Sequence, residues 1–180
     1  MAITNGYATL TQVKSALRIV DNVDDTALEL AIESASRAID TFAMRTFYSS
    51  GTATRYFAPD SIDLVYTDDV AGTALTIQTS SNADNQFDIT WQTTDYQLEP
   101  LNGITDGMAV PYSRIRAVGQ QLFPVFYGEA TVKVTAVWGW TAVPIAITQA
   151  CIIQASRFFK RNDSPLGVAG FGDMGIMRIS

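Results

Sequence analysis

The 180-residue sequence contains no histidine. This absence excludes Ser–His and Cys–His catalytic groups and every histidine metal ligand, because each of these needs an imidazole as base or donor. The single cysteine, Cys151, excludes an internal disulfide, and one thiol does not build a zinc or iron–sulfur site. These absences predict a protein that is not an enzyme and that uses no cofactor.

Long hydrophobic runs are also missing. The most apolar stretch, 142–153, is interrupted by Pro144, Thr148 and Gln149, whereas a membrane span needs roughly 20 apolar residues. The first residues have neither the basic region nor the apolar segment of a signal peptide. We therefore expect a chain that is made in the cytoplasm and has no membrane partner.

Basic residues are absent from one long part of the chain. Residues 56–113 hold nine acidic side chains and no lysine or arginine, whereas residues 114–180 carry a net charge of +4. The whole chain has a net charge of −6, which argues against a protein held to nucleic acid by a basic face. Such segregation of charge indicates regions with different neighbours.

A capping sequence opens the first predicted helix. Thr9 and Gln12 fit a capping box, in which the hydroxyl and the side-chain amide satisfy free backbone N–H groups at a helix start. The apolar spacing that follows predicts a short helix over 9–18.

Two longer apolar stripes predict two further helices. One covers 26–46 after an N-cap at Asp24 or Asp25. The other covers 144–160 and is opened by Pro144, whose missing N–H costs nothing in a first turn. The stripes include Phe42 and Ile145, and the three helices are expected to pack together through Leu17, Leu28, Ile32, Ile39, Ile152 and Phe159.

Between the second and third helices the pattern becomes that of short strands. Turn sequences such as 68–72 and 80–85 separate them, and 131–138 alternates most clearly. We predict an α+β fold: a small core of three main helices, a β-rich insertion between the second and last helices, and an extended C-terminal tail. The predicted parts are 1–49 (N-terminal helical part), 50–140 (acidic insertion), 141–162 (last core helix) and 163–180 (tail).

The other motifs in the sequence do not indicate a nucleotide, metal or catalytic site. Gly170, Gly172 and Gly175 match GxGxxG in letters, but only five residues follow, too few for the helix that a dinucleotide site needs. The carboxylates of Asp60, Asp63, Asp68 and Asp69 lack the spacing of a calcium loop. A glycoside hydrolase that uses only carboxylates stays a less favoured alternative, because the sequence marks no acid and base pair.

The order of the elements carries a resemblance to a known family. The capped helix of 9–18 leads through the acidic turn 21–25 into a long helix, and the strand at 132–140 leads through Val143 and Pro144 into the last helix. Segments 54–57 and 95–100 contribute a β-rich insertion. In this order the chain resembles the head–tail connector (adaptor) proteins of long-tailed bacteriophages.

The resemblance implies a structural virion protein of the neck. Such adaptors form a ring, commonly a dodecamer, beneath the portal protein, extend the DNA channel and give stopper or tail-completion proteins a platform. Double-stranded DNA would pass through the lumen without specific binding. Another virion connector part, a stopper or a tail terminator, remains an alternative.

Two sets of residues are candidates for these contacts. The acidic insertion is expected to line the channel, because like charges repel DNA phosphates: Asp60, Asp63, Asp68, Asp69, Asp84, Asp88 and Asp106. The apolar tail is expected to pack on the portal or on a neighbouring subunit, because soluble monomers rarely expose such patches: Leu166, Phe171, Met174, Ile176, Met177, Arg178 and Ile179.

Overall fold

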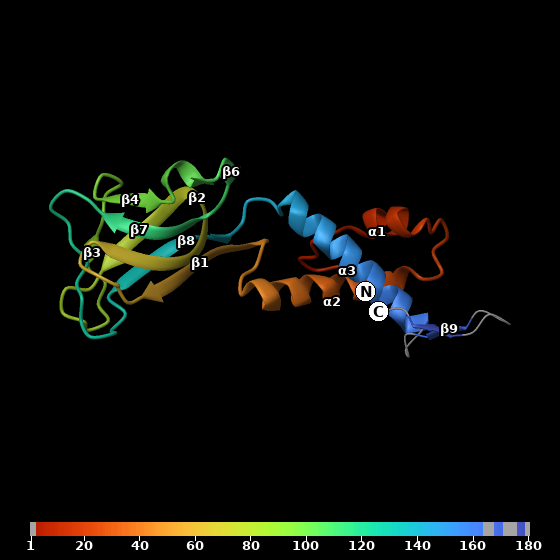
Figure 1. Cartoon of the computed structure of the whole chain (residues 1–180). Helices are drawn as coiled ribbons and strands as arrows, with labels where there is room; N and C mark the ends of the chain where they lie inside the picture. Colours follow the sequence, from red (N-terminus) through yellow and green to blue (C-terminus); the bar gives the residue numbers. More distant parts are fainter. Residues whose placement is uncertain (1–2, 164–167, 171–175, 179–180) are drawn as a thin grey trace. The chain divides into compact units, whose positions relative to one another are not determined.

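The computed structural model describes residues 3–163, 168–170 and 176–178 (Figure 1). The chain forms two compact units. Met1–Phe47 and Val143–Ser180 make the helical unit, and Tyr48–Ala142 make the β unit. The predicted α+β class is confirmed, with an antiparallel sheet inserted between the second and third helices.

Helix α1 (Leu10–Leu17) begins at the predicted capping box. The Thr9 backbone N–H donates to Oε1 of Gln12 at 2.8 Å, and the Gln12 N–H donates to Oγ1 of Thr9 at 3.2 Å. The helix ends at Arg18, whose φ of 60° lies in the left-handed region that closes helices. The sequence therefore determines both ends of this helix locally.

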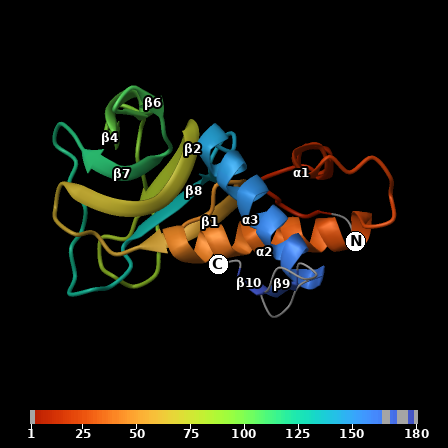
Figure 2. The same cartoon turned by 45° about the vertical axis from the view of Figure 1, so that its right-hand side comes forward.

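Helices α2 (Asp25–Ala43) and α3 (Ile145–Asp163) lie side by side and α1 packs on both (Figure 2). Among the predicted core residues, Leu28 and Ile32 are fully buried. The other four are half-buried: Leu17, Ile39, Ile152 and Phe159. Cys151 of α3 is fully buried, as expected of a small apolar side chain.

The placement of Phe42 and Ile145 on a buried helix face is wrong. Phe42 is 93% exposed and Ile145 is 88% exposed. The buried positions of α2 end at Ser36, and Cys151 is the first buried residue of α3. Helical periodicity identifies a face, but it does not say how far along the helix that face is covered.

The β unit holds one antiparallel sheet with the strand order β1-β8-β2-β7-β4, and β3 also pairs with β2. Two short strands, β5 and β6, pair with each other. The bounds are β1 (Ser49–Phe57), β2 (Leu64–Thr79), β3 (Ile89–Thr90), β4 (Tyr96–Glu99), a 3₁₀ turn (Leu101–Gly103), β5 (Ile104–Thr105), β6 (Met108–Ala109), β7 (Tyr112–Ala117) and β8 (Val132–Gly139).

Strand β2 corrects one expectation. The sequence predicts a turn at 68–72, but Leu64–Thr79 is a single strand. It pairs with β7 up to Val70 and with β8 from Val70 onward, and the register shifts on both sides of this buried residue. Gly72 has a φ of 83°, so the turn-forming residues produce a bulged bend rather than a chain reversal.

Aromatic side chains pack in the core of the β unit. Strand β8 alternates as predicted, with Trp138 among its inward residues and fully buried. The Trp138 indole N–H donates to the Ala53 carbonyl at 2.8 Å. Trp91 stacks on Phe123 with ring centroids 4.5 Å apart. The first contact ties β8 to β1, and the second packs Phe123, in the loop between β7 and β8, into the core.

The described C-terminal residues form a strand pair. Strands β9 (Val168–Gly170) and β10 (Ile176–Arg178) are antiparallel, with Met177 opposite Ala169. In the part of the chain that is described, no helix is both long and apolar enough to span a bilayer.

Candidate partner-binding surfaces

The predicted acidic set lies entirely in the β unit, and an arginine neutralises one of its members at the sheet surface. Asp68 of β2 accepts from Nη1 of Arg55 at 2.6 Å. The same guanidinium lies over the Trp138 ring, 4.5 Å from its centroid, which is a favourable cation–π geometry. Arg55 thereby connects the acidic surface to the core.

In a second group, Arg116 lies between the carboxylates of Asp63 and Glu99. The Arg116 guanidinium donates to Asp63 at 2.7 Å and to Glu99 at 2.6 Å, and the Ser61 hydroxyl donates to Asp63 at 2.7 Å. The hydrogen bond from Ser61, aided by Arg116, lowers the pKa of Asp63. The hydrogen bond to Glu99 raises the pKa of Arg116. Asp63 is therefore part of an ion-pair network rather than a free charge.

Two more acidic residues have local structural partners. The Trp140 indole N–H donates to Asp69 at 2.9 Å. Asp84 accepts from the Gln86 N–H and from the Ser80 hydroxyl, each at 3.0 Å. The Gln86 bond is the main cause of the lowered pKa of Asp84. Both carboxylates hold backbone and indole groups in place.

The remaining members of the set are exposed. Asp60 precedes β2, Asp88 precedes β3, and Asp106 lies in the turn between β5 and β6. These three side chains carry charge on separate loops. The seven residues were grouped by their charge alone. The sequence does not indicate which of them pair with an arginine, accept from an indole N–H or stabilise a turn. That they face a channel stays a prediction.

Most of the predicted tail contacts lie outside the described residues: Leu166, Phe171, Met174 and Ile179. Ile176, Met177 and Arg178 form β10, which pairs with β9. The expected strand at this place is present, but its partner within the described chain is β9. Contact of the tail with another protein stays a prediction.

A buried polar group in the helical unit was not predicted from the sequence. The Tyr7 backbone N–H donates to the Ser36 hydroxyl at 3.0 Å, and that hydroxyl lies 3.4 Å from Sγ of Cys151. The Tyr7 hydroxyl donates to Asp40 and accepts from the Phe47 N–H, which lies 2.7 Å away. Burial raises the pKa of Tyr7 and of the Cys151 thiol.

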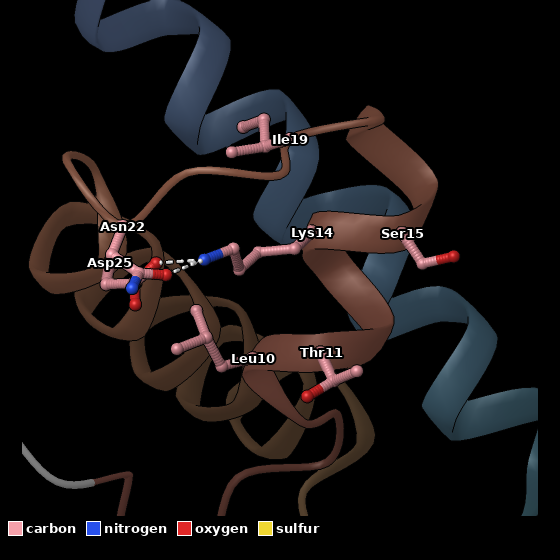
Figure 3. Close-up of a pocket in the computed structure, with 7 residues that line it drawn as sticks. All are labelled: Leu10, Thr11, Lys14, Ser15, Ile19, Asn22 and Asp25. Carbon is pink, nitrogen blue, oxygen red and sulfur yellow. Dashed lines mark hydrogen bonds and ion pairs between the residues drawn. The ribbon is translucent and has the colours of Figure 1, made fainter.

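One pocket of about 420 Å³ lies in the helical unit (Figure 3). In Figure 3 the Lys14 ammonium extends toward Asn22 and Asp25, whereas the Ser15 hydroxyl points away from them. Nζ of Lys14 lies 2.9 Å from the Asn22 oxygen and 2.6 Å from that of Asp25. The lining residues are Leu10, Thr11, Lys14, Ser15, Ile19, Asn22 and Asp25.

The chemistry of this pocket is limited. Its single carboxylate, Asp25, is paired with Lys14, so the pocket lacks the two opposed carboxyl groups of a glycoside hydrolase. Within the described ranges, no three potential metal ligands from histidine, cysteine, aspartate and glutamate lie together. The contacts instead fix the turn between α1 and α2.

Comparison with known proteins shows which family part of the chain is similar to. Residues 7–91 match the family described as "Phage gp6-like head-tail connector protein". This match confirms the resemblance to head–tail connector proteins that the order of elements indicates. Among curated proteins, none matches the sequence.

Two solved structures share the fold. A chain of "Neck of empty GTA particle computed with C6 symmetry" has a TM-score of 0.56 and is 18% identical, with 97% of this chain and 86% of that chain covered. A chain of "Neck of native GTA particle computed with C12 symmetry" has a TM-score of 0.55 and is 16% identical, with 97% and 85% covered. The likeness extends over both the helical unit and the β unit.

Proposed function

We propose that this head–tail connector protein is the adaptor that forms a ring beneath the portal of a phage-like particle. The ring extends the DNA channel and presents a platform to stopper or tail-completion proteins. The observation that carries this proposal is the connector-family match, supported by a fold shared over 97% of the chain with neck chains.

The symmetry of those neck structures supports a ring. They are described with C6 and C12 symmetry, and a twelve-membered ring satisfies both. Because the likeness covers nearly the whole chain, one copy corresponds to one whole subunit of such an assembly. The protein is accordingly a structural part of the particle, and its described pocket offers no acid and base pair for catalysis.

The charge distribution supports a channel that does not retain DNA. The β unit carries ten acidic and four basic side chains, which is a net charge of −6. Local ion pairs neutralise part of this charge, but Asp60, Asp88 and Asp106 remain exposed. Exposed carboxylates repel DNA phosphates, so a genome would pass along this surface without being held.

The helical unit supports the adaptor role over the alternative connector parts. A helical core, rather than a lone β-barrel, favours the adaptor over a stopper or a tail terminator, and three packed helices make one of the two units. The adaptor is therefore the connector role that this fold favours.

The first experiment tests particle assembly. DNA-filled heads that lack this protein are expected to remain tailless, and adding the purified chain is expected to restore tails in electron micrographs. Truncation after Asn162 keeps nearly all of the three helices and is expected to stay folded by circular dichroism but not to bind heads. Tails that form without the protein would overturn the proposal; a truncated chain that restores tails would remove the role of the tail.

The second experiment tests the acidic surface. Asp60, Asp88 and Asp106 are changed together to lysine, and the matched control changes them to asparagine. The lysine variant is expected to gain salt-sensitive DNA binding and to slow genome ejection. The asparagine variant is expected to show neither effect, because it removes charge without attracting phosphate. Unchanged DNA affinity in the lysine variant would place these residues away from the DNA path.

A further inference from the structure

Helix α2 presents an open face opposite its buried one. Leu28 and Ile32 are fully buried, whereas a row on the other side of the helix is exposed. The exposed row is uncharged and is built mainly of small side chains, with Leu30 55% exposed at one end: Leu30, Ser34, Ala38 and Thr41. Another helix could approach this face closely, because its side chains are mostly small.

Helix α3 also presents an open face. Cys151 and Ala155 are buried in the helical unit, whereas residues at three- and four-residue spacing on the other side are exposed: Ala146, Gln149, Ala150, Ile153, Arg157 and Lys160. Because α2 and α3 pack on each other, their open faces point away from each other. One helical unit therefore carries two different faces on opposite sides.

The charges at the ends of these helices are complementary. Asp21 and Asp24 are exposed near the start of α2, and Asp24 makes no side-chain capping bond. Arg157, Lys160 and Arg161 are exposed near the end of α3, and none of them forms an ion pair with the described residues. The acidic end of one helix thus matches the basic end of the other.

The geometry points to a subunit contact in which α2 of one copy packs antiparallel on α3 of the next copy. This inference rests on the proposed ring. A contact between two different faces is heterologous, and such contacts generate rings when the rotation closes. Each helix has 19 residues, so full overlap spans about 28 Å and places Ala38 opposite Ala150.

The charges also select the direction. Antiparallel packing brings Lys160 and Arg161 toward Asp24 of the neighbouring copy. Parallel packing would instead bring them beside Asp40, whose carboxylate is already paired with Arg37, and toward Arg45, which follows the end of α2. Arg45 repels these basic side chains and Asp40 already has a cationic partner, whereas Asp24 attracts them. The charges therefore favour the antiparallel arrangement.

Disulfide trapping tests the contact directly. Ala38→Cys and Ala150→Cys are introduced together with Cys151→Ala, and the purified chain is oxidised at high concentration. The double variant is expected to give a ladder of covalent oligomers, whereas each single variant stays almost entirely monomeric, because residue 38 faces residue 150 and not itself. A decoy pair on the β unit, Gln97→Cys with Gln120→Cys, reports random collision.

Charge reversal tests the direction. Lys160→Glu with Arg161→Glu is expected to weaken trapping by roughly tenfold, and adding Asp21→Lys with Asp24→Lys is expected to restore it. Changing Gln86, Gln92, Gln97 and Gln120 to glutamate is the matched control and should leave trapping unchanged. Single variants or decoys that link as well as the double variant, or an absent ladder while rings form on heads, would overturn the contact. Heads that never carry the protein would instead refute the proposed ring itself.

Discussion

The helical unit and the β unit distribute charge differently. The helical unit has eight acidic and eight basic side chains, whereas the β unit has ten acidic and four basic ones. In the β unit Arg55 and Arg116 lie against carboxylates of the sheet. In the helical unit Asp24 and Lys160 lie at the ends of long helices. The first pattern leaves net negative charge on a surface, and the second leaves opposite charges separated at helix ends.

The two units are also stabilised differently. The β unit has a continuous apolar core with Trp138 fully buried. The helical unit combines apolar packing with a buried polar group around Tyr7 and Ser36. All three tryptophans lie in the β unit, so tryptophan fluorescence reports on one unit while helical circular dichroism reports on the other.

The largest effect is expected from Leu28→Asp. Leu28 is fully buried in α2, so the change removes apolar contacts and buries an unpaired carboxylate, at a cost of more than about 5 kcal/mol. The helical circular dichroism signal is expected to be lost while tryptophan fluorescence keeps its native maximum. Leu30→Asp, on the exposed face of the same helix, is the control. Loss of both signals together would mean that the two units fold as one.

Trp138→Ala is the reciprocal test. Trp138 fills the core of the β unit and donates to Ala53, so its loss should cost about 3–5 kcal/mol. Fluorescence of Trp91 and Trp140 should shift to the exposed range at lower urea, while the helical signal persists to its usual midpoint. Tyr127→Ala is the control, because Tyr127 is exposed. A helical midpoint that falls equally would contradict separate stabilities.

Local sequence was sufficient to predict the ends of α1 and the alternation of β8. The capping pair Thr9 and Gln12 acts within one turn, and the inward positions of β8 follow the strand period. Both features depend on neighbours in the sequence, so no knowledge of the rest of the fold was needed.

Other features depend on distant parts of the chain and could not be predicted. The turn-like residues at 68–72 lie within β2 because β7 and β8 pair with its two halves. Asp63 is neutralised by Arg116, which lies 53 residues later. Grouping acidic residues by sequence therefore overestimates the free charge of the candidate surface.

A medium effect is expected from Tyr7→Phe. The change removes the hydrogen bond that the Tyr7 hydroxyl accepts from the buried Phe47 N–H and the one that it donates to Asp40. Loss of such a partner costs about 1–3 kcal/mol, so the urea midpoint of the helical signal should fall while that of fluorescence stays. Tyr127→Phe, at an exposed position, should change neither midpoint. An unchanged helical midpoint in Tyr7→Phe would show that the polar group does not stabilise this unit.

The smallest effect, and the one confined to acid, is expected from Asp63→Asn. The folded β unit lowers the pKa of Asp63 through Ser61 and Arg116. A carboxyl group whose folded pKa is depressed stabilises the fold above its unfolded pKa of about 3.9, and this contribution is lost as the pH falls through the folded pKa. The fluorescence midpoint of the unaltered chain should therefore fall between about pH 5 and about pH 3. In Asp63→Asn this fall of the midpoint should be smaller, because the titrating carboxyl group is gone. In the control Asp88→Asn, a change at an exposed loop residue, the fall of the midpoint should match that of the unaltered chain. An Asp63→Asn protein with the full acid dependence would assign the acid sensitivity of the β unit to other carboxylates.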